Sequence, residues 1–129
     1  GGPFLGKAFG DAAAAGRVPF EYCHTAMTYT ALATLLTVGD DLSGVDREAV
    51  VMGLKPLQTP SGSFQAIQSE DQDDMRFVYT ACVISHLLGD WRGVDVEGAA
   101  AFIMRCQTYE GGFSLAEGQE AHGGATYCA

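Results

Sequence analysis

Three segments of this sequence repeat at a near-constant interval, and this repeat constrains the fold more than any other feature. Each segment has a polar residue followed five positions later by a tyrosine: His24 and Tyr29, Asp74 and Tyr79, His122 and Tyr127. A fixed period of about 50 residues is typical of repeat proteins, in which each unit buries its apolar face by stacking on its neighbours. The three polar residues therefore occupy one equivalent position, and we expect them to contribute to one site.

The segments between these positions predict one helical hairpin per repeat, because no segment alternates strictly between apolar and polar residues. Asp46 and Asp95 have the form of helix N-caps, Gly39 and Gly89 that of helix ends, and Pro56 should shorten or bend its helix. Five helices are expected: Thr25 to Val38, Asp46 to about Leu57, Asp73 or Asp74 to Leu88, Asp95 to Gln107, and near Ala125 to Ala129. The predicted fold class is all-α.

About two and a half such repeats fit into residues 23–129. Residues 1–22 are rich in Gly and Ala and lack helical periodicity, so they are predicted to be an N-terminal connector. A hairpin repeat of this kind cannot bury its apolar face alone. We therefore expect an incomplete part of a larger closed ring or solenoid.

Composition excludes some classes of protein. With 16 acidic and 7 basic residues the formal net charge is −9, which disfavours a nucleic-acid binder. No apolar run reaches the roughly 18 residues of a membrane span, and no secretory leader pattern is found. Cys82 and Cys106 lie within apolar helical patterns, as buried cysteines of a reducing compartment would. We expect a soluble, cytoplasmic protein.

Several of these motifs resemble those of the protein prenyltransferase β subunits, which are α/α toroids with inner and outer helices around a funnel. The resemblance rests on four segments and covers roughly residues 23–129: His24–Ala31, Gly39–Ser43, Asp74–Tyr79 and Glu120–Cys128. Within this family the segments are most similar to the type I branch, which transfers a geranylgeranyl group. The resemblance implies a heterodimer with an α-helical α subunit.

The activity implied by the resemblance is transfer of the C20 group from geranylgeranyl diphosphate to the cysteine of a C-terminal CaaX sequence with leucine at X. The acceptors of such enzymes include small GTPases. Zinc activates the acceptor thiol in this family, through an Asp-x-Cys pair and a later histidine. No such pattern occurs here, so no metal ligand is predicted within this chain, and we expect the fragment to be inactive alone.

The His-Gly-Gly sequence at the start of the fifth helix is the best candidate for binding the isoprenoid diphosphate. Free N–H groups at a helix start attract phosphate, and glycines let it approach closely. The resemblance assigns His122, Gly123, Gly124 and Arg76 to the diphosphate, and Tyr79 and Cys128 to the isoprenoid wall. A structural interpretation is also open: His122 as a helix cap, Arg76 paired with Asp73, and Tyr127 in helix packing.

The acceptor peptide is expected near the starts of the first and third helices. The resemblance assigns peptide contacts to His24, Ala26, Phe77 and Arg76. Helix capping by His24 and core packing by Ala26 and Phe77 are the structural alternatives. One position departs from the family: Gln72 stands where a glutamate usually shares the waters that hold the peptide carboxylate.

Two other functions remain open from the sequence. Asp71 to Asp74 spell the DxDD motif of class II terpene or squalene cyclases, whose central Asp73 would act as a general acid. Arg76 lies close enough to oppose protonation of that acid, and Met75 stands where Thr or Ser is usual. A non-catalytic α/α repeat module that binds another protein is the second alternative.

Overall fold

The computed structural model describes residues 24–68 and 72–129, so the predicted connector 1–22 lies outside the described residues. The elements are α1 (Thr25–Thr37), α2 (Arg47–Leu54), the 3-10 turn η3 (Lys55–Leu57), α3 (Met75–Leu88), α4 (Val96–Arg105) and α5 (Gly123–Cys128). Extended pairing in the described ranges is limited to isolated bridges, such as Gln58 with Phe64. The predicted all-α class and the five predicted helices are confirmed.

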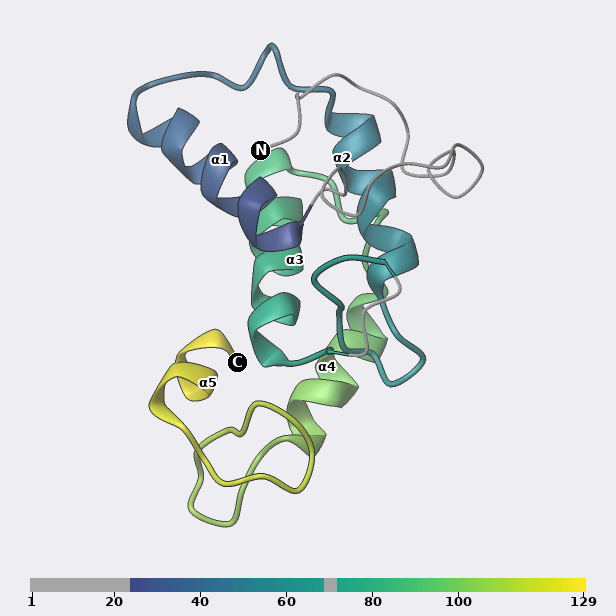
Figure 1. Cartoon of the computed structure of the whole chain (residues 1–129), viewed down its shortest axis with the longest axis vertical. Helices are drawn as coiled ribbons and strands as arrows, with labels where there is room; N and C mark the ends of the chain where they lie inside the picture. The colour runs from purple at the N-terminus through teal and green to yellow at the C-terminus, as the bar shows by residue number, and fades with distance from the viewer. Residues whose placement is uncertain (1–23, 69–71) are drawn as a thin grey trace.

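The helix that begins each repeat belongs to one layer, and the second helix of each hairpin lies outside it. In Figure 1, α3 is central, α1 crosses it, α5 lies near its start, and α2 and α4 lie on its other side. Contacts join α3 to α1, α5 and α2. The order of the repeats along the chain is thus also their order in space.

The predicted helix boundaries follow from local chemistry. Asp46 and Asp95 cap α2 and α4 by accepting from the backbone N–H groups of Ala49 and Gly98, at 3.0 and 3.1 Å. The α-helical part of α2 ends at Leu54, and Pro56 lies in the 3-10 turn η3 that follows. The prediction that Pro56 shortens this helix is confirmed.

The second helix of each hairpin, α2 or α4, is the outer helix of its repeat. The turn that follows the outer helix is built in the same way in both repeats. Thr59 N–H donates to the Ser63 carbonyl and Thr108 N–H to that of Gly112, each at 2.9 Å. Gly62 has φ +90, and an added Cβ there would lie 2.0 Å from the Gly98 carbonyl oxygen. Only glycine fits this position without a shift of α4.

One apolar core runs between the layers and centres on α3. It combines Ile84 and Val78 of α3 with Leu32 of α1, Val51 of α2 and Phe102 of α4, all at most 3% exposed. Each helix alone would leave its apolar stripe in water, so the packing against α3 stabilises all of them.

The two repeats are also joined by side chain to backbone hydrogen bonds. Asp95 N–H donates to Gln58 Oε1 at 2.7 Å, and Gln58 Nε2 donates to the Asp95 carbonyl at 2.9 Å. Farther along α4, Arg105 donates to the Ser61 carbonyl and pairs with Glu117. The turn of the first repeat therefore holds both ends of the outer helix of the second.

The cysteines in the described ranges carry free thiols. Cys106 is 1% exposed and Cys82 is half-buried, and burial raises the pKa of each thiol. This agrees with the prediction that both are packing residues. Cys23 lies outside the described residues.

Candidate functional site

The three equivalent polar residues all cap the helix that begins their repeat. His24 Nδ1 accepts from Ala26 N–H at 3.1 Å, and Asp74 Oδ1 accepts from Arg76 N–H at 2.9 Å. His122 Nδ1 accepts from Gly124 and Ala125 N–H at 3.1 and 3.2 Å. The superposition predicted from the repeat is therefore present in the structure.

Capping also determines which ring nitrogen carries the proton in the neutral forms of His24 and His122. An imidazole nitrogen that accepts from a backbone N–H carries no proton, so in the neutral ring the proton is on the other nitrogen. In His24 and His122, Nε2 is then an N–H donor directed away from the helix start. Each ring can hold its helix through one nitrogen and donate to a ligand through the other.

This geometry corrects one expectation for the start of α5. The sequence suggested that free backbone N–H groups there would receive a phosphate. The N–H groups of Gly124 and Ala125 are instead taken by the ring of His122. A Cβ on Gly124 would lie 2.9 Å from Cε1 of that ring, so this glycine makes room for the cap. The donor offered to an anion is His122 Nε2.

The first turn of α3 carries a tightly paired arginine. Arg76 Nε lies 2.9 and 3.1 Å from the two carboxylate oxygens of Asp74, and Nη2 donates to Oδ2. The sequence had suggested Asp73 as its partner, which is wrong. Asp73 instead accepts from the Thr59 and Ser61 hydroxyls at 3.3 and 3.5 Å, so it belongs to the preceding turn.

The charge on Arg76 is secured by this pairing. Hydrogen bonding with Asp74 raises the pKa of the guanidinium, although partial burial opposes the shift. The Arg76 side chain is still 55% exposed, whereas that of Asp74 is 11% exposed. The guanidinium of Arg76 is therefore a solvent-exposed cation whose position is fixed by the buried carboxylate of Asp74.

The predicted peptide residues form a continuous group between α1 and α3. The Arg76 guanidinium lies 5.4 Å from the centroid of the Phe77 ring, and the His24 ring meets Phe77 edge-on at 6.0 Å. Ala26 is half-buried in the first turn of α1 and bonds to His24. His24, Ala26, Phe77 and Arg76 are thus brought together.

The predicted isoprenoid wall contains a row of three tyrosines. Tyr29 meets Tyr79 at 5.9 Å between ring centroids, and Tyr79 meets Tyr127 at 6.0 Å. Hydrogen bonding with Tyr29, burial and Tyr127 raise the pKa of Tyr79 to about 12. Tyr29 also packs against the apolar core, and its shared repeat position was the signal that it would join this row.

Cys128 interacts electrostatically with the pair formed by Asp74 and Arg76. Burial and the nearby Asp74 raise the pKa of its thiol, and Arg76 opposes them. By contrast, no hydrogen bond or ring contact in the described ranges joins His122 to Arg76, the two side chains predicted to bind the diphosphate.

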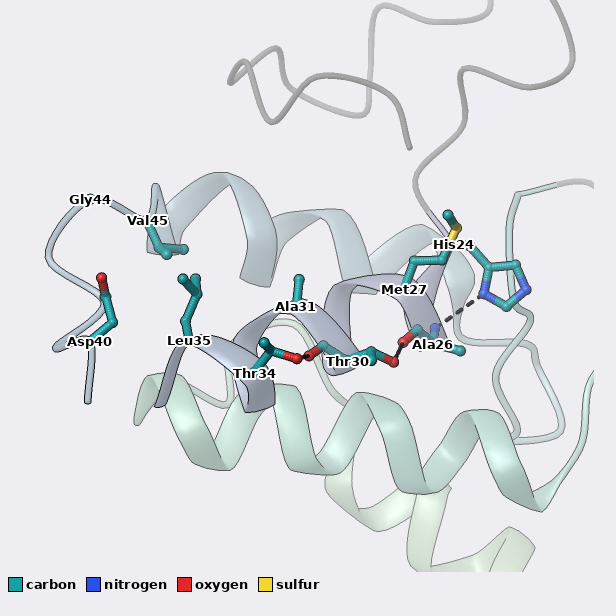
Figure 2. A pocket seen from close by; sticks show the side chains of 10 residues that line it. All are labelled: His24, Ala26, Met27, Thr30, Ala31, Thr34, Leu35, Asp40, Gly44 and Val45. Atoms are coloured by element: carbon teal, nitrogen blue, oxygen red, sulfur yellow. Dashed lines mark hydrogen bonds between the residues drawn. The ribbon is translucent and has the colours of Figure 1, made fainter. Parts of the chain in front are cut away.

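A groove of about 1090 Å³ runs along the other flank of α1. Figure 2 shows His24 and Ala26 at one end of it and Asp40, Gly44 and Val45 at the other. Between them, the Thr30 and Thr34 hydroxyls donate to carbonyls of their own helix at 2.6 and 2.8 Å. The groove surface is therefore largely apolar, and no sequence pattern had predicted it.

Across residues 24–68 and 72–129, no three His, Cys, Asp or Glu side chains are grouped so that they could hold a metal ion. These residues do not fit a zinc site. The helices in the same ranges are also too short or too polar to cross a bilayer.

Comparison with known proteins places this helical repeat in a family. The model described as the prenyltransferase alpha-alpha toroid domain matches residues 3–129. The chain belongs to this family. The α/α toroid class predicted from the repeats and the resemblance is thus confirmed.

Named relatives of this toroid domain are subunits of protein prenyltransferases. The chain is 47% identical over 106 residues to "Geranylgeranyl transferase type-1 subunit beta" of Arabidopsis thaliana, which is 82% of the chain and 28% of the relative. The protein of that name from Dictyostelium discoideum is 38% identical over 88% of the chain and 33% of its own length. "Protein farnesyltransferase subunit beta" of Arabidopsis thaliana is 37% identical over 97% and 26%. The chain thus spans about a third or less of these relatives.

Proposed function

We propose that this toroid domain is part of the β subunit of a protein prenyltransferase that attaches a geranylgeranyl group to CaaX cysteines with leucine at X. The observation that carries the proposal is the 47% identity with a geranylgeranyl transferase type-1 subunit beta over most of the chain. The geometry of the helix starts is consistent with it, since it offers fixed donors for anions beside an aromatic wall. A heterodimer with an α subunit belongs to the same proposal.

In this proposal His122 and Arg76 donate to the diphosphate of geranylgeranyl diphosphate, and Gly123 and Gly124 beside His122 carry no side chain that would block its approach. The acceptor thiolate attacks the first carbon of the isoprenoid, and diphosphate leaves with the bonding electrons. Negative charge grows on the leaving group, so positioned donors lower the barrier. His122 Nε2–H and the Arg76 guanidinium are the donors on this chain that would receive it.

The same proposal assigns residues to the isoprenoid chain and to the acceptor peptide. Tyr79 and Cys128 line the isoprenoid wall, and the tyrosine row extends that wall to Tyr29 and Tyr127. His24, Ala26, Phe77 and Arg76 contact the end of the acceptor peptide, where the arginine and the His24 Nε2–H attract its carboxylate. Gln72, exposed next to Asp73, contributes a neutral amide to that region.

Zinc enters this proposal only through the family resemblance. When bound, zinc lowers the pKa of the acceptor thiol, so that a thiolate is present at neutral pH. The described residues do not fit such a site. The role assigned to this chain is therefore to bind, orient and neutralise charge.

Two alternatives differ in the substrate they predict. Farnesyl transfer is supported by the 37% identity with a farnesyltransferase subunit beta. A cyclase would need Asp73 as an acid, but Asp73 holds the Thr59 turn and Asp74 caps α3. Asp71, the first residue of the DxDD motif, lies outside the described residues.

The test is transfer by the full-length subunit assembled with its α subunit. We expect transfer of the C20 group to a peptide ending in CaaX with leucine, and slower transfer of the C15 group. Preferred use of farnesyl diphosphate would favour the farnesyl alternative. Conversion of squalene or geranylgeranyl diphosphate without any acceptor peptide would contradict the proposal.

A pair of variants separates the two anion sites. Asparagine supplies a capping oxygen in place of the histidine Nδ1 but removes the Nε2–H donor. His122→Asn should weaken binding of geranylgeranyl diphosphate about 10-fold without loss of fold. His24→Asn, the same exchange two repeats earlier, should instead raise the KM of the peptide. Equal effects of both variants on both substrates would contradict the assignment.

A further inference from the structure

Asp74 differs from the two residues that share its repeat position, because it performs two tasks at once. Its Oδ1 caps α3 through Arg76 N–H, and both oxygens also bind the guanidinium of the same residue. The whole residue is only 8% exposed. A buried carboxylate whose two oxygens are both occupied by one neighbour leaves that neighbour little freedom.

The three repeats show why an aspartate is required here. Two residues after the cap stand Ala26 in the first repeat and Gly124 in the third, and the caps of those repeats are histidines. A capping imidazole has a single acceptor nitrogen, which the helix uses, whereas a carboxylate has two oxygens. The repeat that carries an arginine at this position is therefore also the repeat whose cap can bind it.

The pairing leaves one edge of the guanidinium available. Asp74 occupies Nε and Nη2, and within the described residues no hydrogen bond involves Nη1. The Phe77 ring lies near the guanidinium, 5.4 Å from its carbon, which further limits rotation. A guanidinium is planar, so fixing one edge also fixes the direction of the other.

We propose that Asp74 is a positioning residue that fixes Arg76 so that its Nη1 edge faces a substrate anion. This inference rests on the proposed function, which supplies two such anions: the diphosphate of the isoprenoid and the terminal carboxylate of the peptide. Orientation, and not charge alone, is the contribution of Asp74. A preorganised donor binds more tightly because no side-chain freedom is lost on binding.

A double-mutant cycle in the full-length heterodimer tests the inference. Asp74→Asn keeps a capping oxygen but removes the carboxylate that holds the guanidinium. We expect this change to weaken substrate binding about 10-fold, because the guanidinium must then be ordered when the substrate binds. In an Arg76→Gln background the same change should have no effect, because the group that it orients is gone. An equal loss in both backgrounds would show a merely structural role and overturn the inference.

Two measurements identify the anion. The Kd of geranylgeranyl diphosphate reports on the diphosphate, and the KM of a CaaX peptide at saturating diphosphate reports on the carboxylate. If Asp74→Asn weakens one of these constants in the wild-type background but not in the Arg76→Gln background, the positioning role is supported. The constant that changes then identifies the anion that Arg76 binds. Unchanged Kd and KM in Asp74→Asn would overturn it.

Two further variants control for folding and charge. Asp95→Asn makes the same exchange at the cap of α4, where no arginine of the described residues pairs with the carboxylate, and should leave both constants unchanged. Arg76→Lys keeps the charge and the cap but lacks the planar fork, so it should lose as much affinity as Asp74→Asn. Wild-type affinity in Arg76→Lys would overturn the inference even if Asp74→Asn failed to fold.

The outcomes also separate this inference from the proposed function. A wild-type heterodimer that binds neither substrate refutes the proposed function, and the ligand assigned to Arg76 with it. A wild-type heterodimer that is active but shows no coupling between Asp74 and Arg76 refutes the positioning role alone.

Discussion

A single side chain at the start of each inner helix can serve folding and recognition with different atoms. His24 and His122 use Nδ1 for the helix and keep Nε2–H for other partners, whereas Asp74 uses its second oxygen for Arg76. The sequence alone left helix capping and ligand binding as competing interpretations of these residues. The geometry makes them compatible, since neither task needs the atom that the other employs.

The tyrosine row gives a prediction at the same scale. The pKa of Tyr79 is raised to about 12, so the neutral phenol is favoured in the folded state. An unfolded chain ionises its tyrosines near pH 10, and it therefore loses this proton first. The stabilisation is complete below pH 10 and should be lost as the pH rises from about 10 to about 12. Urea unfolding of the wild type and of Tyr79→Phe across this range measures it.

The expected result is a weaker pH dependence of the free energy of unfolding in Tyr79→Phe. Tyr109→Phe is the matched control, because Tyr109 is 98% exposed and should change nothing. If Tyr79→Phe and the wild type lose stability equally over this range, the tyrosine row does not hold the phenol neutral.

At the scale of elements, the turn between the outer helix and the next inner helix is sharply constrained. Gly62→Ala would place a Cβ 2.0 Å from the Gly98 carbonyl oxygen, at φ +90. We expect this variant to lower the free energy of unfolding by about 2 kcal/mol or more. Denaturant unfolding checks the value.

Gly44→Ala provides the control for that experiment. No atom lies within 4 Å of a Cβ added at Gly44, and its φ is not in the left-handed region. It should change the free energy of unfolding by about 0.5 kcal/mol or less. A similar small effect of Gly62→Ala would mean that the turn can move away from α4.

Most element boundaries could be predicted because they depend on neighbours in sequence. Gly39 and Gly89 end their helices with positive φ, and Asp46 caps α2, as local rules predict. The same rules could not choose between Asp73 and Asp74, because both carboxylates precede the same helix. The choice depends on Thr59 and Ser61, which reach Asp73 from the preceding turn.

At the scale of the whole molecule, the hydrogen bonds of Gln58 link one repeat to the next. Gln58→Ala removes two bonds to the Asp95 backbone, of 2.7 and 2.9 Å. We expect a loss of about 1–2 kcal/mol in the free energy of unfolding. Hydrogen exchange at the Asp95 amide should accelerate at the same time, since its acceptor is gone.

Gln119→Ala serves as the reference, because the side chain of Gln119 is exposed in a loop. It should leave both measurements unchanged. Unaltered exchange at Asp95 in Gln58→Ala would show that water or another group replaces the glutamine, and that the repeats do not depend on this link.

The repeat as a whole was predictable from the sequence, but the bonds between repeats were not. Gln58 and Gln107 stand 49 positions apart in the sequence, but the partner of Gln58 lies far along the chain. Gln58 meets Asp95, and Arg105 meets Ser61, over separations for which helix periodicity gives no rule. The candidate site could not be predicted from helix periodicity for the same reason, because the contact between His24 and Phe77 joins two repeats.

The shared capping position has a consequence for how such a protein can change over time. The helix requires only a side chain that accepts a hydrogen bond at its N-cap, and both an imidazole and a carboxylate can do so. Successive copies of one ancestral unit could therefore diverge at this position without losing the helix. Duplication followed by exchange of that single residue would give each copy a different chemical character while the scaffold stays the same.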